Sequence, residues 1–395
     1  MTRPDPIMLC NVCQAPLGAP LYESRGKLSL TSLCELRPGR TRVWCCDRCG
    51  HLQGEPLPDT AQYYASDYRI LLDHDDEDQI YDTERTADGG ERIVYRTQHQ
   101  LRLLLERLPL PEGARLLDYG CAKAAMPRLL AAERPDLQLH LFDVSEMYRS
   151  HWDRLLPRER QAVNEAPAGW HGSFDAVISF FALEHIPAPI ASVAHVAALL
   201  KAGGSFYGVV PCTVGNPADF IVADHVNHFT TASLHRLLAD AGFGAICIEP
   251  DVHRGALVFR AVKAGVAALG PEPSVVRPQA QALARFWSEL SDRIAAAEHA
   301  AGDVPVAIYG SGVYGAHIAA SLAHPERLRC FLDRNPFQQG KALFERPVLA
   351  PEQLPDDVTQ LYVGLNPSIA RQALSDQPWL ARSRARPFFL DGGAP

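Results

Sequence analysis

Short apolar runs alternate with longer amphipathic stretches through the middle of the chain. An apolar run of four to eight residues that ends at a turn signal is typical of a buried strand, whereas apolar positions three and four apart predict a helix. The predicted strands are 114–120, 137–143, 174–181, 205–210, 245–248 and 256–261. The predicted helices are 91–108, 124–133, 183–200 and 233–241. This order predicts an α/β domain with a Rossmann-like sheet.

A second α/β pattern follows a long amphipathic stretch over 279–301. A predicted strand runs into Gly310-x-Gly312-x-x-Gly315, and Asp333 ends the next predicted strand. This spacing is a complete dinucleotide fingerprint. Its glycines let the start of a helix approach a diphosphate, which both a dinucleotide and a nucleotide sugar contain. Only 80 residues follow Gly315, too few for the separate substrate domain of a typical dehydrogenase.

Two Cys-x-x-Cys pairs precede both α/β patterns. The pairs are Cys10 with Cys13 and Cys46 with Cys49, separated by 32 residues. Each pair can form a turn whose sulfurs converge, and two such turns complete a tetrahedron around zinc. Cys45 is an alternative to Cys46. Because four thiolates leave no position for water, we expect a structural Zn²⁺ site.

Composition and charge narrow the class of protein. The chain has 395 residues, 47% of them apolar and 21% charged, and a formal charge of −8, as in ordinary globular proteins. The excess of acidic over basic residues argues against a nucleic-acid partner. The lack of a long apolar run argues against a membrane span or a signal peptide. We therefore expect a cytoplasmic protein. The acidic block 73–78 is predicted to be a solvated loop rather than a second metal site.

Candidate chemistry follows the carboxyl ends of the predicted strands, where α/β sheets bind ligands. Asp143 lies 23 residues beyond Gly120, the separation at which an acid meets a ribose in a nucleotide-binding βαβ unit. His185 follows one strand directly, and Asp224 and His225 follow another. A histidine with a pKa near ~6.5 can remove a proton at neutral pH, and a carboxylate can hold its tautomer. His225 is the predicted base, with Asp224 as its orienter.

Five segments of the middle region, taken in order, resemble class I S-adenosylmethionine-dependent methyltransferases. They are LLDYGCAK, LHLFDVS, FDAVISFFALEHIPAP, LLKAGGSFYGVVP and HFTTASLHRLLADAGF, within residues 115–263. One motif differs, because the usual loop of three glycines keeps only the first, with alanine at 122 and 124. The resemblance implies cofactor contacts from Asp118, Gly120, Ala122, Asp143 and Phe181.

The remaining segments are similar to deoxysugar-nucleotide C-methyltransferases. CNVC, CDRCGHLQ and YYASDYR resemble that family's zinc domain, and VAIYGSGVYG, FLDRNPFQQGK, PVLAPEQL and LYVGLNPSIARQAL its final domain. The resemblance implies methylation of a carbon next to a keto group, through an enolate. The family's Tyr-x-Glu-His pattern falls on residues 222–225, where valine replaces tyrosine and aspartate replaces glutamate. The implied catalytic residues are His225, Asp224, His185 and Tyr68, and the implied substrate contacts are His228, Gly310, Gly312, Gly315 and Asp333.

Together these features predict four parts and one preferred function. The parts are a zinc-binding domain (1–75), a methyltransferase domain (76–265), a linker helix (266–302) and a Rossmann-like nucleotide-sugar-binding domain (303–395). The predicted function is methyl transfer from S-adenosylmethionine to a nucleotide-linked sugar, a small-molecule partner. O- or N-methylation, a non-catalytic nucleotide-binding protein and a nicotinamide oxidoreductase are the alternatives. The sequence leaves the oligomeric state open.

Overall fold

The computed structural model describes residues 8–69, 74–86, 90–264 and 267–391. Its contacts divide the chain into two compact units. The first comprises residues 1–20, 43–216 and 225–280, and the second comprises residues 21–42, 217–224 and 281–395. These units cut across the four predicted parts, because 21–42 and 217–224 pack with the C-terminal region. No helix within the described ranges is long and apolar enough to cross a membrane.

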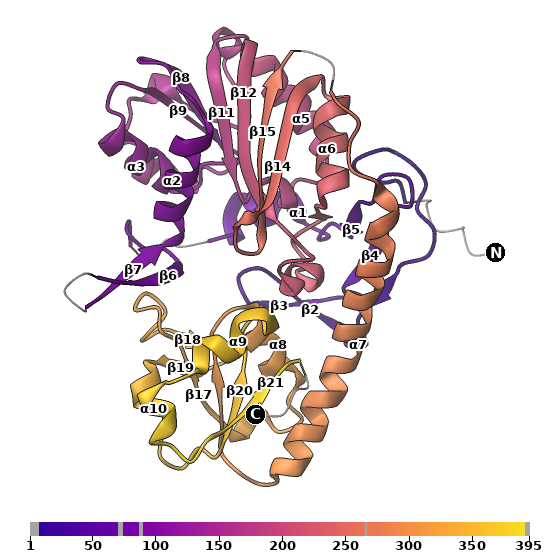
Figure 1. Ribbon diagram of the computed structural model, residues 1–395, viewed down its shortest axis with the longest axis vertical. Helices are drawn as coiled ribbons and strands as arrows, with labels where there is room; N and C mark the ends of the chain where they lie inside the picture. The colour runs from indigo at the N-terminus through magenta and orange to yellow at the C-terminus, as the bar shows by residue number, and fades with distance from the viewer. Residues whose placement is uncertain (1–7, 70–73, 87–89, 265–266, 392–395) are drawn as a thin grey trace. The chain divides into compact units, whose positions relative to one another are not determined.

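A seven-stranded sheet forms the centre of the first unit, in the order β10-β9-β8-β11-β12-β15-β14 (Figure 1). The strands are β8 (Arg115–Tyr119), β9 (Gln138–Asp143), β10 (Gln161–Val163), β11 (Phe174–Phe180), β12 (Leu200–Pro211), β14 (Phe243–His253) and β15 (Ala256–Lys263). The five strands from β10 to β12 are parallel, and β15 pairs antiparallel with β12 and β14. The predicted Rossmann-like fold is therefore confirmed.

Helices cover both faces of this sheet. Neighbouring residues of each strand point to opposite faces, so an apolar strand presents apolar side chains on both faces that must be buried. The helices are α2 (Arg96–Arg107), α3 (Ala125–Glu133), α4 (Arg149–Trp152), α5 (Pro189–Leu199) and α6 (Thr231–Asp240). Leu116 packs in one core with residues of α2 and α3, whereas Leu117 packs in another with residues of α5 and α6. Figure 1 shows the two helix pairs on either side of the strands.

Two predicted helices begin later than their patterns suggested. The predicted helix 91–108 is helical only as α2, because Glu91–Tyr95 forms strand β7 and pairs with β6 (Ile80–Arg85). The β-branched and aromatic residues of β7 favour a strand over a helix. The predicted helix 183–200 starts as a single 3₁₀ turn, Leu183–His185, and α5 begins at Pro189. Two prolines in this stretch remove backbone donors and restrict the preceding residues, which explains the interruption.

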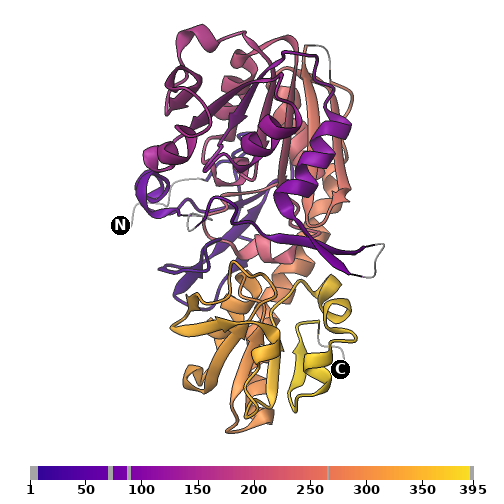
Figure 2. The ribbon, with the colours of Figure 1, turned by 90° about the vertical axis from the view of Figure 1, so that its left-hand side faces the viewer.

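Smaller elements accompany the central sheet, and most of them precede it in sequence. In the first unit β4 (Arg42–Cys45), β5 (Leu52–Gly54) and β13 (Asn227–His228) pair antiparallel in that order. The short helix α1 (Thr60–Gln62) continues into a π-helical segment, Tyr63–Asp67. Figures 1 and 2 show the β6–β7 hairpin projecting from the body of this unit.

A six-stranded sheet forms the second unit, in the order β18-β19-β17-β16-β20-β21. Its strands are β16 (Val306–Tyr309), β17 (Leu328–Leu332), β18 (Ala342–Leu343), β19 (Arg346–Leu349), β20 (Gln360–Val363) and β21 (Arg386–Phe389). The associated elements are β1 (Tyr22–Glu23), the hairpin of β2 (Leu28–Leu30) and β3 (Leu36–Pro38), α8 (Val313–Ser321), α9 (Pro367–Leu374) and α10 (Pro378–Ala381). The helix α7 (Val276–Ala301) matches the predicted long amphipathic stretch.

Candidate functional site

The turn after β8 keeps the backbone shape of a glycine-rich loop although only its first glycine remains. Gly120 has φ of +81°, and a Cβ added there would lie 2.7 Å from the Cβ of Ala182. Ala122 and Ala124 also have positive φ, 43° and 60°. Each alanine costs ~1 kcal/mol or more in this region, so other contacts must hold the loop in place.

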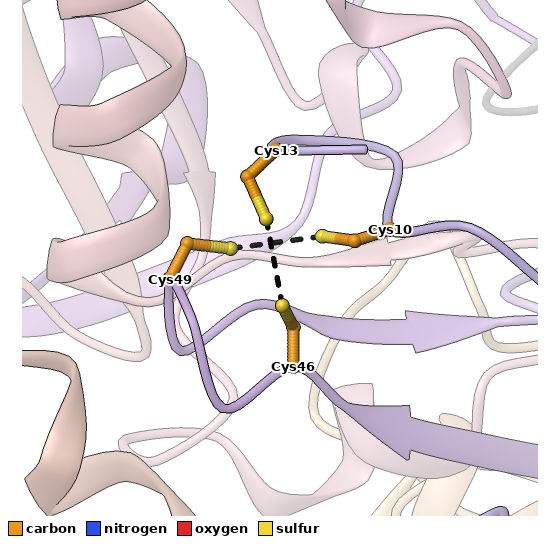
Figure 3. Close-up of side chains that lie close together, drawn as sticks. All are labelled: Cys10, Cys13, Cys46 and Cys49. Carbon is orange, nitrogen blue, oxygen red and sulfur yellow. Dashed lines mark hydrogen bonds between the residues drawn. The ribbon is translucent and has the colours of Figure 1, made fainter. Parts of the chain in front are cut away.

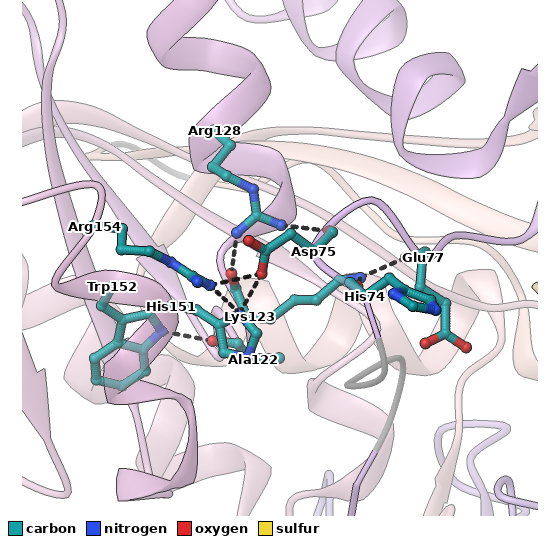
Figure 4. A network of polar contacts seen from close by, with 9 residues as sticks. All are labelled: His74, Asp75, Glu77, Ala122, Lys123, Arg128, His151, Trp152 and Arg154. Atoms are coloured by element: carbon teal, nitrogen blue, oxygen red, sulfur yellow. Dashed lines mark hydrogen bonds and ion pairs between the residues drawn. The ribbon is translucent and has the colours of Figure 1, made fainter.

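Those contacts come from two sides of the loop (Figure 4). Trp152 Nε1 donates to the carbonyl oxygen of Ala122 at 2.6 Å. Lys123 Nζ donates to the carbonyl oxygens of His74 at 3.0 Å and Glu77 at 2.5 Å. The lysine that follows the first alanine therefore ties the loop to the acidic segment upstream.

The acidic block 73–78 is not a uniformly solvated loop, which corrects the sequence-based expectation. Asp73 lies outside the described residues, and Asp75 is exposed and pairs with His151 Nδ1 at 2.8 Å. Glu77 and Asp78, in contrast, are buried. Asp78 accepts a hydrogen bond from the backbone N–H of Thr97, at the start of α2. The block is held because its carbonyl oxygens accept from Lys123 and its last acid caps a helix.

Two buried carboxyl groups end the adjacent strands β8 and β9. Asp118 is 3% exposed, and no hydrogen-bond donor contacts its side chain within the described ranges. Burial, and then the nearby Asp143, raise the pKa of Asp118 to about 8. Asp143 accepts hydrogen bonds from the backbone N–H groups of Ala122 at 2.8 Å and Ser145 at 3.1 Å. A buried acid without a donor favours a cationic ligand, such as the amino or sulfonium group of S-adenosylmethionine.

We therefore predict that S-adenosylmethionine binds more tightly as the pH rises from 6 to 8. With a pKa of about 8, the need to ionise Asp118 at pH 7 lowers the affinity about tenfold, and this cost vanishes above pH 8. Calorimetry across this range measures the slope. The Asp118→Asn variant should bind S-adenosylmethionine weakly, and its affinity should no longer change with pH. A flat profile for the unsubstituted protein would show that Asp118 does not ionise toward the cofactor.

Two histidines from separate loops meet near the carboxyl edge of the sheet. The rings of His185 and His225 pack edge to face, with centroids 4.6 Å apart. One ligand atom each of Glu184, His185 and His225 lies within 4.8 Å of the others, and all three side chains are buried. Tyr64 Oη lies 2.9 Å from His185 Nδ1, and Tyr68 Oη lies 3.4 Å from His185 Nε2. This arrangement can move a proton, and its donor set also suits a divalent transition metal.

The structure brings three of the predicted catalytic residues together: Tyr68, His185 and His225. Tyr64 was not among the predicted residues, although the adjacent tyrosines of YYASDYR were an available signal. Asn227 was not predicted either, and its Nδ2 donates to the carbonyl oxygens of Leu183 at 3.0 Å and Ile186 at 2.7 Å. Asn227 joins the two histidine-bearing segments.

Two other predicted residues have different surroundings. Asp224 accepts hydrogen bonds from Ser32, through the backbone N–H at 2.7 Å and through Oγ at 2.6 Å. Its predicted role as the orienter of His225 stays a prediction. Val222, at the position of the family's tyrosine, is buried and bridges to Leu30. His228 lies in β13, where it pairs with Leu52.

The four predicted cysteines form one cluster (Figure 3). Cys10 and Cys49 sulfurs are 3.6 Å apart, and Cys13 and Cys46 sulfurs are 3.5 Å apart. Hydrogen bonds from Cys10 and Cys49 lower the pKa of Cys46, whereas the hydrogen bond with Cys46 raises the pKa of Cys10 to about 12. The four-cysteine cluster fits the donor set and spacing of a zinc site, and Cys45 lies outside it.

Close packing explains why two positions of the glycine loop in the second unit require glycine. A Cβ at Gly310 would lie 2.5 Å from the carbonyl oxygen of Gly364, and a Cβ at Gly315 would lie 2.0 Å from the carbonyl oxygen of Gly310. Gly312, at the start of α8, has no atom within 4 Å of such a Cβ. Asp333 Oδ2 accepts from the backbone N–H of Ser311 at 3.0 Å and from its Oγ at 2.6 Å. Gly312 is thus the position open to a ligand, and substrate contact by this loop stays a prediction.

Comparisons with known proteins identify the domain that holds the first glycine loop. The family model described as "Methyltransferase domain" matches residues 93–248. The chain is similar to the proteins named ubiquinone biosynthesis O-methyltransferase from Xanthomonas campestris pv. campestris (strain B100), at 35% identity, and Xanthomonas axonopodis pv. citri (strain 306), at 36%. Each alignment covers 31% of this chain and 53% of the relative, so the chain spans about half the length of these relatives.

A solved structure titled as an S-adenosylmethionine dependent methyltransferase from Mesorhizobium loti is 20% identical, with a TM-score of 0.34, and covers 42% of this chain and 96% of that chain. The family match and the order of the seven-stranded sheet agree on one assignment. Residues 93–248 form a class I S-adenosylmethionine-dependent methyltransferase domain.

Proposed function

We propose that the methyltransferase domain of residues 93–248 transfers a methyl group from S-adenosylmethionine to a nucleotide-activated sugar. The observation that carries the proposal is the meeting of His185 and His225 with two tyrosines, near the carboxyl edge of the sheet that also ends in Asp118 and Asp143. Ligands of open α/β sheets bind at this edge. A proton-transfer group and a cofactor loop therefore serve one reaction.

The cofactor would be held by the residues predicted for it. Gly120 allows close approach of the backbone, and Ala122 belongs to a loop already fixed by Trp152 and Asp143. Asp143 would accept from a ribose hydroxyl with its remaining lone pairs. Asp118 would pair with the positive charge of the cofactor, whose sulfonium supplies the methyl group when bound. Phe181, directly after β11, would border the same pocket.

His225 would take the proton that the reaction releases. For a sugar carbon next to a keto group, His225 removes the α-proton and becomes imidazolium, and the electron pair of the C–H bond forms the enolate. That carbon then forms a bond to the methyl carbon as the bond to sulfur breaks. Tyr64 and Tyr68 would fix the ring of His185 beside the base. His228, on the same segment as His225, would contribute to binding of the acceptor.

O-methylation is the second candidate, and two observations favour it. The similar Xanthomonas proteins are named O-methyltransferases. Val222 also stands where the C-methyltransferase pattern has a tyrosine. A hydroxyl is more acidic than a carbon α to a ketone, so it needs less help from the protein to lose its proton.

We further propose that Cys10, Cys13, Cys46 and Cys49 hold a structural Zn²⁺ ion. Two sulfur pairs at 3.5 and 3.6 Å, with three of the four cysteines buried, support this assignment. Four thiolates would fill a tetrahedral ion and leave no position for a reacting water.

The first experiment is calorimetry with S-adenosylmethionine, followed by reaction of methyl-¹³C cofactor with acceptors. The acceptors are keto-deoxysugar nucleotides and catechols, and copurifying small molecules identified by mass spectrometry extend the set. The ¹³C shift of the product separates a methyl on carbon from one on oxygen. We expect a C-methylated sugar nucleotide. Transfer only to a hydroxyl supports the second candidate, and no cofactor binding at millimolar concentration excludes both.

A further inference from the structure

A second group of aromatic and basic side chains lies in the first unit, beyond the residues used so far. The ring of Tyr81 stacks on His99, with centroids 3.8 Å apart and planes 11° apart. The ring of His253 meets Tyr81 at 5.0 Å and His99 at 5.4 Å. Phe181 meets His253 at 5.9 Å. Tyr81 comes from β6, His99 from α2 and His253 from the end of β14, so three elements converge beside the residue that follows β11.

Two arginines lie against these rings. The guanidinium carbon of Arg254 is 4.8 Å from the ring centroid of Tyr81, and that of Arg96 is 4.9 Å from the ring centroid of Phe181. Arg254 also donates to the carbonyl oxygen of Tyr81. Arg92 and Arg107 pair with carboxylates, whereas neither Arg96 nor Arg254 has an ion pair with a carboxylate within the described ranges. The positive charge of this group is therefore not neutralised by the side chains around it.

Neighbouring positive charges also act on His253, which belongs to this group. Burial, and then the charges of His99, Arg96 and Arg254, lower the pKa of His253 to about 4, although a backbone contact opposes the shift. Asp78 caps the start of α2 through the backbone N–H of Thr97.

Phe181 links this group to the site of methyl transfer. It is a bulky residue with φ of +51°, a conformation that is rare outside glycine and that concentrates at functional sites. The strand start at Ala256 pairs with Pro211 at the carboxyl end of β12, which places the Arg254 turn at the edge of the sheet where α/β proteins bind ligands.

We propose that Arg96 and Arg254, which lie against the rings of Phe181 and Tyr81, form a subsite for the phosphate groups of the acceptor. The proposal rests on the proposed function, since it assigns part of the substrate of that reaction. Arginine suits phosphate because its planar fork donates two hydrogen bonds, and the aromatic rings hold each guanidinium in place. In this assignment the diphosphate of a nucleotide sugar binds to the methyltransferase unit itself rather than to the glycine loop of the second unit.

The test is titration of the full-length protein with inorganic pyrophosphate by calorimetry at low salt. Arg96→Gln and Arg254→Gln should each weaken binding about tenfold, because each removes a charge-assisted hydrogen bond. Arg85→Gln is the matched control, since it removes one exposed positive charge from β6 of the same hairpin, and its affinity should stay within about twofold. The affinity of the unsubstituted protein should fall as salt is raised.

S-adenosylhomocysteine binding to each variant separates this proposal from the proposed function. The arginine variants should retain it, which shows that the fold and the cofactor loop are intact. Absence of pyrophosphate binding at millimolar concentration overturns the subsite, as does binding that none of the arginine variants weakens. Equal weakening in Arg85→Gln overturns it too, because the effect is then one of net charge. In each of these cases methyl transfer itself can still occur.

Discussion

Replacing His225 with alanine should lower the rate of methyl transfer about 10²–10⁴-fold, the usual contribution of a general base. The imidazole of His225 packs against His185, whose nitrogens lie 2.9 Å from Tyr64 Oη and 3.4 Å from Tyr68 Oη. No other base in this cluster comes from the same loop. Single-turnover kinetics with saturating cofactor measures the chemical step directly.

The control for this variant is affinity for S-adenosylhomocysteine, which should change little, since Asp118, Gly120 and Asp143 lie on other segments. His225→Gln keeps the size of the side chain and removes its basicity, so it should be as slow as the alanine variant. Equal loss of rate and cofactor affinity would instead indicate a structural role. Rescue of the rate by an added divalent metal would indicate that Glu184, His185 and His225 act as ligands.

Much of the central sheet could be predicted because its strands are short, apolar and bounded by turns. Leu116 and Leu117 point into different cores, which is why the run is apolar without alternation. The same reasoning failed at residues 91–95, because Ile93 and Val94 pair with β6 through the tertiary fold. Local propensity there competes with a helical pattern that continues without interruption into α2.

The candidate site was predictable in part, for a similar reason. Strand ends and residue types were enough to select His185 and His225, and the family resemblance supplied Asp118. The contact of Tyr64 with His185 and the bracing by Asn227 depend on segments 121 and 41 to 44 residues away in sequence, which no local pattern encodes. The acidic block failed as a solvated loop because Lys123, far along the chain, holds its carbonyl oxygens.

The glycine loop shows how the chain departs from its family pattern while keeping the backbone shape. Ala122 and Ala124 occupy positive φ, where glycine has no steric cost. Trp152 and Asp143 contact the loop, Lys123 ties it to the segment upstream, and these contacts together offset that cost. A loop fixed by side chains is rigid before the cofactor arrives, which favours binding because less order has to be gained on association.

The largest effect on stability is expected for Cys46→Ser. Structural zinc contributes ~10–16 kcal/mol of apparent binding free energy in small zinc-finger peptides, and that energy stabilises the fold. We expect the variant to lose zinc, measured by elemental analysis of the purified protein, and to unfold at a lower temperature, measured by circular dichroism. Cys45→Ser is the matched control, since Cys45 is the buried neighbour outside the cluster and should leave zinc content unchanged.

Loss of zinc should also disturb the segment that carries His225 and Asn227. Asn11, between Cys10 and Cys13, donates through Nδ2 to Asn227 Oδ1 at 2.9 Å, and Asn227 in turn holds the carbonyl oxygens that follow β11. Thr230 Oγ1 donates to the carbonyl oxygen of Gly50, directly after Cys49. Cys46→Ser should therefore reduce methyl transfer along with stability. Full zinc content in Cys46→Ser together with its loss in Cys45→Ser would make Cys45 the fourth ligand, and full zinc in both would exclude the proposed tetrahedral site.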